Sequence, residues 1–239
     1  LYQDSDILNI PFLSVDIDKK IIKFKTKEIF ITKPLIIPDN YKLVAEKGSK
    51  IILQDDGFIV SKSPLFFIGS ELNPISIVGE SKTKTNGIIL LNAKKTSVMD
   101  NVIFKNLTNI EYKSWLLPGA VTFYQSPIRI SNCIFENSRS EDALNIVRSN
   151  FEIDNIKVLK SSSDAIDIDF SDGTLSNILI ENSGNDGLDL SGSNVKIDEI
   201  IINNSQDKAL SVGEGSVISV DKLFIKRANV GVANKDGSN

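Results

Sequence analysis

The second half of the sequence repeats itself every 22 residues, and this repeat constrains the fold more than any other feature. Most copies begin with a charged residue, continue with a small residue and then alternate between apolar and polar residues. The copies occupy residues 142–146, 164–168, 186–190, 208–212 and 230–234. A fixed period of this length is typical of solenoids, in which each repeat is covered by its neighbours and is not stable alone.

Each repeat contains three short strand signals separated by small or polar residues, as at 187–190, 195–198 and 200–203. Within them the side chains alternate, with Leu188 and Leu190 on one face and Asp189 on the other, which indicates strands. We therefore predict an all-β fold, a right-handed parallel β-helix with about 22 residues per coil and three parallel sheets. One interior stack is predicted to contain Leu144, Ile166, Leu188, Leu210 and Val232.

The chain is predicted to form a single β-helix domain over residues 1–239, with residues 1–34 as an N-terminal cap. Asn101 and Asn132 precede similar strand segments but lie 31 residues apart, so we predict an inserted loop at 109–118. The sequence stops partway through a coil. We therefore expect a larger protein with flanking domains or coils, or end-to-end self-association through an uncovered strand edge.

Composition excludes several classes of function. The sequence has no histidine, which removes the commonest general base and most zinc chemistry. The net charge is −4, and residues 121–239 alone carry −7, so nucleic acid is not expected as a partner. Because no stretch approaches about 18 consecutive apolar residues, no membrane span is expected.

The outward positions of the repeat predict an acidic strip across several coils. Asn145, Asp167, Asp189 and Ser211 occupy one outward column, with Asp169 beside it. Small residues are predicted to form a second outward column as a shallow floor: 143, 165, 187, 209 and 231. Stacked carboxylates repel one another, so a raised pKa, a cation or a basic side chain must neutralise them. Calcium held by Asp167, Asp169 and Asp189 is one alternative, and the basic neutralisers are Lys208 and Arg148.

The coils resemble the pectate-lyase-like superfamily of right-handed β-helices, many of which cut, epimerise or bind polysaccharides. The segment 185–189 and Gln206-Asp207-Lys208 are similar to motifs of polygalacturonase-like glycoside hydrolases. The resemblance implies that Asp186 is the first catalytic carboxylate and Asp207 the first of a pair. This sequence has Lys208 where the family has the second Asp, and it lacks the family's histidine.

Two readings of the acidic residues remain open. In the catalytic reading, carboxylates one or two coils apart match the spacing of retaining or inverting glycosidases, and a Lys208 of lowered pKa is the base of a lyase. The candidate catalytic residues are Asp164, Asp167, Asp186, Asp189, Asp207 and Lys208. In the structural reading, one Asp at the same corner of each coil binds backbone amides as a ladder: Asp142, Asp164, Asp186 and Asp207.

Three side chains are candidates for substrate binding: Trp115, Tyr112 and Arg148. The two aromatic rings either stack on sugar rings or pack against the outer wall of the solenoid. We expect a polysaccharide-interacting protein, either a lyase or hydrolase acting on an acidic polysaccharide, or a non-catalytic binding or structural module of a larger surface protein. The superfamily resemblance implies a bacterial extracellular, cell-surface or periplasmic location.

Overall fold

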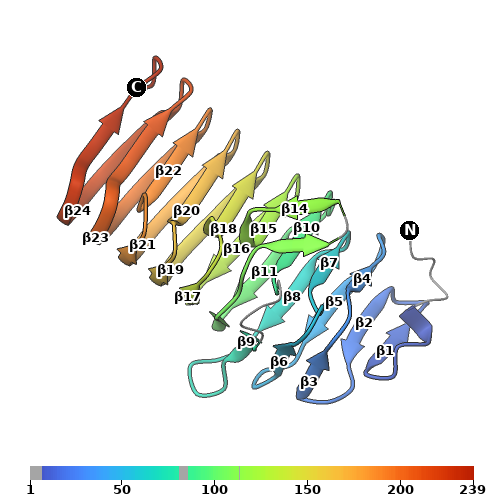
Figure 1. The fold of residues 1–239 in the computed structure, drawn as a ribbon. Coiled ribbons are helices and arrows are strands. Elements are labelled where there is room, and N and C mark those ends of the chain that lie inside the picture. The colour runs from blue at the N-terminus through green and yellow to red at the C-terminus, as the bar shows by residue number, and fades with distance from the viewer. Residues whose placement is uncertain (1–6, 81–85, 113) are drawn as a thin grey trace.

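Short runs of alternating apolar and polar residues form a β-solenoid of about nine turns, with parallel stacked coils of about 23 residues (Figure 1). The computed structural model describes residues 7–80, 86–112 and 114–239. The predicted all-β solenoid is confirmed. From residue 144 onwards, Leu144, Ile166, Leu188 and Leu210 stack as strand partners at the predicted 22-residue interval. The two coils between Ile59 and Val121 are longer, since Ile59 pairs with Ile88 and Ile88 pairs with Val121.

The strands form three faces, which we call sheets I, II and III. Sheet I contains β4 (Leu35–Ile37), β7 (Ile59–Ser61), β10 (Ile88–Leu91), β15 (Gly119–Tyr124), β18 (Asp142–Val147), β20 (Asp164–Asp169), β22 (Leu188–Ser191) and the final parts of β23 (Asn194–Gly213) and β24 (Val217–Asn234).

Sheet II contains β2 (Ile21–Phe24), β5 (Lys42–Ala45), β8 (Leu65–Ile68), β11 (Ser97–Asp100), β16 (Ile128–Ser131) and the first parts of β19 (Asn150–Ser161), β21 (Asp172–Ser183), β23 and β24. Sheet III contains β3 (Glu28–Ile31), β6 (Lys50–Leu53), β9 (Ile75–Gly79), β12 (Val102–Lys105), β17 (Ile134–Ser138) and the following parts of the same four long strands.

The core lies inside the coils, where each inward side chain covers the same position of the next coil. Leu144, Ile166 and Leu188 are almost completely buried, as predicted. The prediction of an outward floor of small residues is wrong, because Ala143, Ala165 and Ala209 are buried in the core. Each stands at the corner that enters sheet I, where the chain turns inward for two successive residues. A larger side chain does not fit there: a Cβ on Gly187 would lie 2.7 Å from Ile202.

Stacked hydrogen bonds stabilise the corners between the sheets. At the corner from sheet II to sheet III, Asn101, Asn132, Asn155 and Asn177 adopt positive φ, a conformation that asparagine tolerates. Asn155 Nδ2 donates to Asn132 Oδ1 at 2.7 Å, so side-chain amides of neighbouring coils stack at this corner.

A second ladder runs along the corner from sheet I to sheet II. It consists of buried serines whose Oγ atoms accept hydrogen bonds from the backbone N–H one coil earlier, with N···O distances of 2.9–3.0 Å. The serines are Ser126, Ser149, Ser171, Ser193 and Ser216. These hydrogen bonds satisfy backbone groups that the turn would otherwise leave unpaired inside the solenoid.

The N-terminal region is shorter as a cap than the predicted 1–34. β2 pairs in parallel with β5, and β3 pairs with β6, so the first coil begins at Ile21. Before it, β1 (Leu13–Asp16) pairs antiparallel with β2. Ile7 and Leu13 are buried in the hydrophobic core, so the residues that precede β2 cover the interior of the first coil.

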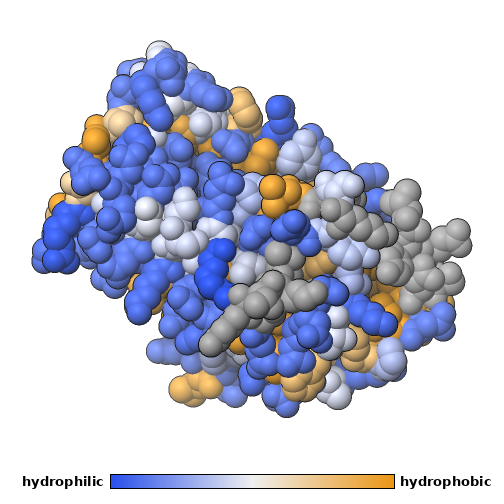
Figure 2. Space-filling view, in the orientation of Figure 1, coloured by the Kyte–Doolittle hydropathy of each residue, from blue (hydrophilic) through white to orange (hydrophobic). Residues whose placement is uncertain are grey.

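Hydrophilic residues cover most of the solenoid face drawn in Figure 2, and the hydrophobic ones are scattered in small groups. Among the residues described, no helix has the length and apolar character needed to cross a membrane.

Candidate functional site

One outward column of sheet I changes from apolar to polar along the solenoid. Strand pairing places its members directly above one another: Ile36, Val60, Ile89, Thr122, Asn145, Asp167, Asp189, Ser211 and Ala233. The change occurs between Ile89 on β10 and Thr122 on β15. The predicted outward column from Asn145 to Ser211 is therefore the polar part of a longer column.

The inserted segment covers the apolar part of this column. It folds into an antiparallel hairpin of β13 (Ile110–Tyr112) and β14 (Trp115–Leu117), which lies across β10 and β15 in Figure 1. Ile110 is completely buried against Phe58, Val60 and Ile89, in a cluster separate from the solenoid core. The insertion thus forms a packed wall on sheet I.

The hairpin contains two of the predicted substrate-binding residues, Tyr112 and Trp115. The Tyr112 ring packs edge-on against the Phe58 ring, with 5.3 Å between the ring centroids, and packs against the same cluster. This contact agrees with the packing alternative. The backbone of Trp115 pairs with Tyr112, but its side chain lies outside the described part of the chain.

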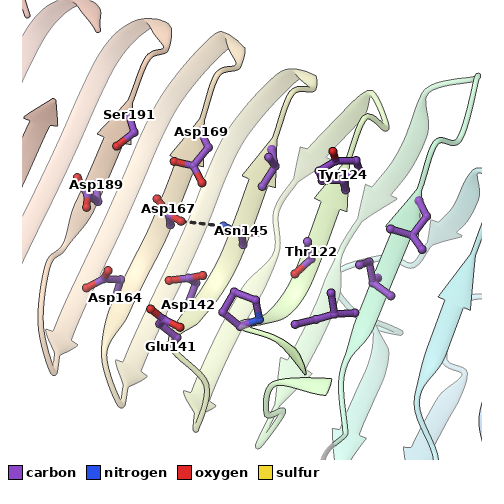
Figure 3. Close-up of a pocket in the computed structure, with 15 residues that line it drawn as sticks. Thr122, Tyr124, Glu141, Asp142, Asn145, Asp164, Asp167, Asp169, Asp189 and Ser191 are labelled. Atoms are coloured by element: carbon purple, nitrogen blue, oxygen red, sulfur yellow. Dashed lines mark hydrogen bonds between the residues drawn. The ribbon is translucent and has the colours of Figure 1, made fainter. Parts of the chain in front are cut away.

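Beside the hairpin, the outer face of sheet I forms an open groove of about 660 Å³ (Figure 3). Its apolar end is lined by residues of β10, the hairpin and β15: Ile89, Leu91, Leu117, Pro118 and Tyr124. Its polar end is lined by residues of three successive coils: Glu141, Asp142, Asn145, Asp164, Asp167, Asp169, Asp189 and Ser191. The predicted acidic strip is therefore one wall of a groove that also has an apolar wall.

Asp167 lies in the middle of the acidic residues. Asn145 Nδ2 donates a hydrogen bond of 2.8 Å to Asp167 Oδ2. Burial, reinforced by the charges of Asp142, Asp169 and other neighbouring carboxylates, raises the pKa of Asp167 to about 9. At neutral pH this side chain is a carboxylic acid that can donate a proton.

The neighbouring carboxyls are shifted in the same direction. Burial and the charges of Asp164 and Glu141 raise the pKa of Asp142 to about 8. Burial also raises the pKa of Asp169, with further contributions from the charges of Asp189 and Glu214. Protonation therefore relieves part of the repulsion between the stacked carboxylates, which was one of the predicted alternatives.

The described residues contain no preformed site for calcium. No group of three or more carboxylates within them is arranged to hold a metal ion. Asp167, Asp169 and Asp189 lie on two neighbouring strands, β20 and β22. Asp169 pairs in register with Ser191 instead of a further carboxylate.

Asp164 and Asp186 form the structural ladder that was the alternative to catalysis. Asp164 Oδ1 accepts hydrogen bonds from the Asp186 backbone N–H at 2.8 Å and from Asn185 Nδ2 at 2.7 Å. One coil further, Asp186 Oδ1 accepts the Lys208 backbone N–H at 2.9 Å. Burial still raises the pKa of Asp164, although these hydrogen bonds oppose the shift. Asp164 lines the groove, whereas Asp186 is not among its lining residues.

Lys208 binds two of the residues expected to be catalytic. Its Nζ lies 3.3 Å from Asp186 Oδ1 and also pairs with Asp207 Oδ2. The hydrogen bond that Lys208 donates to Asp207, reinforced by the charge of Asp186, raises the pKa of Lys208. The expectation that burial makes Lys208 a base of lowered pKa is therefore wrong, because its two carboxylate partners stabilise the ammonium form.

Arg148 stacks over the ring of Phe170, with 5.0 Å between the guanidinium carbon and the ring centroid. It adopts positive φ at the corner that leaves sheet I and is not among the residues that line the groove. This stacking interaction accounts for the position of Arg148 without a substrate.

The sequence interpretation missed the residues that complete the groove. Thr122, Tyr124 and Glu141 line it, and Thr122 Oγ1 has no hydrogen-bond partner among the described residues although the residue is only 5% exposed. Tyr124 is 37% exposed, whereas its neighbour Phe123 is buried. The repeat spacing could have identified Thr122, because it lies 23 residues before Asn145 in the same column.

No protein-family model matches this sequence, and a search of curated proteins found no match.

Proposed function

We propose that this β-solenoid binds a polysaccharide in the sheet I groove and hydrolyses it with Asp167 and Asp189. The observation that carries the proposal is a carboxyl of raised pKa, Asp167, stacked directly beside a second aspartate in a groove that has an apolar wall. Sugar-binding sites combine apolar surface for ring faces with a few polar groups that fix orientation. The resemblance to pectate-lyase-like proteins supports the same class of ligand.

Asp167 is assigned as the general acid, because its raised pKa keeps it protonated at neutral pH. Asp189 is assigned as the nucleophile. The two residues are register partners on neighbouring parallel strands, which lie about 4.8 Å apart. A carboxyl separation near 5 Å is typical of retaining glycosidases, so we propose retention of configuration.

The chemistry follows the double-displacement scheme. An oxygen of Asp189 attacks the anomeric carbon while Asp167 gives its proton to the departing glycosidic oxygen, and the carbon–oxygen bond breaks. Asp167, now ionised, removes a proton from water, which attacks the anomeric carbon and releases Asp189. Asn145, hydrogen-bonded to Asp167, orients the acid.

The charge of the groove favours an uncharged polysaccharide over the acidic one expected from the sequence. The glycan would lie against a cluster of five aspartates and one glutamate, and residues 121–239 carry a net charge of −7. A uronate chain would add like charges to a site that already keeps several carboxyls neutral. A lyase is also disfavoured, because Lys208 is held as an ammonium by Asp186 and Asp207.

The test uses linear hexasaccharides of glucose, xylose, mannose, N-acetylglucosamine and galacturonic acid, with a reducing-end assay. We expect cleavage of an uncharged substrate with retained configuration by NMR, falling as the pH rises through about 9. Asp167→Asn and Asp189→Asn should each reduce the rate about 100-fold or more. The control is Asp172→Asn, an exposed residue of sheet II that should leave the rate unchanged. Absence of cleavage across the panel would overturn the hydrolase assignment.

A non-catalytic glycan-binding module is the second candidate. The ladder hydrogen bonds of Asp164 and Asp186 favour it, because they give two of the stacked carboxylates a structural role. This candidate predicts binding of a hexasaccharide by calorimetry without bond cleavage, and equal binding by Asp189→Asn.

A further inference from the structure

We propose that the groove is closed at its β10 end and therefore binds the end of a glycan chain instead of its interior. This inference rests on the glycan-binding part of the proposed function, and it applies whether or not the chain is cleaved. The β13–β14 hairpin sets this specificity for the end of a chain.

The hairpin forms a wall at the β10 end of the groove. Leu117 and Pro118 line the groove, while Ile110, Tyr112 and Leu117 pack on the outer face of β7 and β10. The sheet I surface beyond Ile89, on the N-terminal side, is thus covered by protein. A glycan that runs along the column from Asp189 towards Ile89 must stop at this wall.

The Thr122 hydroxyl lies in the groove lining next to this wall and has no hydrogen-bond partner among the described residues. The residue is more than nine-tenths buried. Such a buried polar group costs free energy unless a ligand or water pairs with it. Thr122 is also the first polar member of the column, and a rotation of its side chain would present the buried Oγ1 to a terminal sugar hydroxyl placed against the wall.

The opposite end of the groove, beyond Asp189, has no such wall among the described residues. Beyond Asp189, the column continues over Ser211 on β23 and Ala233 on β24, with no inserted hairpin in this described part of sheet I. Figure 3 shows the side chains in rows across successive strands, from Thr122 and Asn145 to Asp167 and Asp189. The chain would leave the site in this direction, with Tyr124 and Pro118 near its terminal sugar.

The experiment measures binding stoichiometry as a function of chain length. The probes are linear glycans of about 6, 12 and 24 sugars from each uncharged series named above, titrated by calorimetry into the Asp167→Asn protein to prevent cleavage. We expect one protein molecule per glycan chain at every length. Binding in which the number of protein molecules per chain rises with chain length would overturn chain-end recognition while leaving the proposed function intact. If no series binds, both are overturned.

Two variants locate the chain end within the site. Thr122→Val, which keeps the shape of the side chain, should weaken hexasaccharide binding roughly tenfold because the terminal hydroxyl loses its partner. The matched control is Thr174→Val, the same substitution at an exposed residue of sheet II outside the groove lining, and it should leave affinity unchanged. Equal affinity of Thr122→Val and the parent protein would overturn the assignment of Thr122.

Replacement of residues 110–117 by a Gly-Ser linker opens the wall. The variant also carries Val60→Thr and Ile89→Thr, because the hairpin otherwise protects these side chains. We expect the longest glycan to bind more than one molecule of this variant. One molecule per chain at every length, in a variant with an unchanged far-ultraviolet circular dichroism spectrum, would contradict the role of the hairpin.

Discussion

In the outward column of sheet I that runs from Ile36 to Ala233, the chemistry of each residue depends on its coil. Val60 and Ile89 bind the hairpin, Thr122 and Asn145 present hydrogen-bonding groups, and Asp167 is buried enough to stay protonated. Under the proposed function, the same backbone position therefore serves packing, binding and proton transfer. Because stacked residues share one geometry, side-chain identity and neighbouring charge determine the differences.

Asp167→Asn should stabilise the protein at alkaline pH. The folded-state pKa of about 9 lies above the ordinary aspartate value of 3.8, so the folded protein favours the neutral acid. The stability associated with this acid is fully present below pH 3.8 and is lost as the pH rises towards 9. The free energy of unfolding of Asp167→Asn should exceed that of the parent by roughly 2 kcal/mol at pH 8, after allowance for solvent screening, and match it at pH 4. Urea unfolding at both pH values measures the difference, and an equal difference at both would contradict the raised pKa.

Asp186→Asn should destabilise the protein much more than Asp207→Asn. The Asp186 side chain is 3% exposed and pairs with both the backbone N–H and the Nζ of Lys208, whereas the Asp207 side chain is 44% exposed. Loss of a buried charge partner costs about 3 kcal/mol, and loss of an exposed one less than about 1 kcal/mol. Urea midpoints of the two variants measure the comparison, and similar midpoints would show that Asp186 is not a structural anchor.

At the level of elements, the hairpin and the corner ladders determine where the solenoid can carry a site. The repeat predicted the strands after residue 142 because their spacing is regular, and the excess length predicted an insertion at 109–118. The sequence could not predict that the insertion packs on Phe58, Val60 and Ile89. These partners come from earlier coils of irregular length, and short apolar runs of this kind do not reveal which face of a strand is covered.

Ile110→Ala should detach the hairpin from the solenoid. Ile110 is completely buried in the cluster under the hairpin, so its truncation should cost about 3 kcal/mol of local stability. Hydrogen exchange of the β13 and β14 amides should accelerate, while that of β20 and β22 stays unchanged. The control is Leu116→Ala on the same hairpin, because Leu116 is 69% exposed and its loss should change exchange little. Equal acceleration by both variants would show that the Ile110 contact does not hold the hairpin.

At the level of the whole molecule, contacts run almost entirely between adjacent coils. The sequence therefore predicted the interior stacks from spacing alone, and Leu144, Ile166 and Leu188 confirm them. It did not predict that the small residues of the repeat lie inside, because the alternation breaks at the corner entering sheet I. The groove also could not be predicted, since it depends on the packing of the hairpin beside β15 and on the burial of Asp142.

Leu188→Ala should have a local effect that fades along the solenoid. Leu188 is completely buried between Ile166 and Leu210, so its truncation should cost about 3 kcal/mol. In a molecule with nearest-neighbour contacts, protection from hydrogen exchange should fall most in β20, β22 and β23 and least in β6 and β9. A uniform fall in protection across all sheets would indicate that the solenoid unfolds as one cooperative unit.

Because the coils stack in register, the number of coils between two residues of one column sets the distance between their side chains. Asp167 and Asp189 are separated by one 22-residue repeat and hence by one strand spacing. Insertion of one coil between them, with a small residue at its position in the column, would move the two carboxyls from about 5 Å to about 10 Å apart, close to the separation that accommodates a water molecule in inverting glycosidases. In such a scaffold, the separation that sets the stereochemistry of the proposed reaction can be changed without a new fold, by one additional coil.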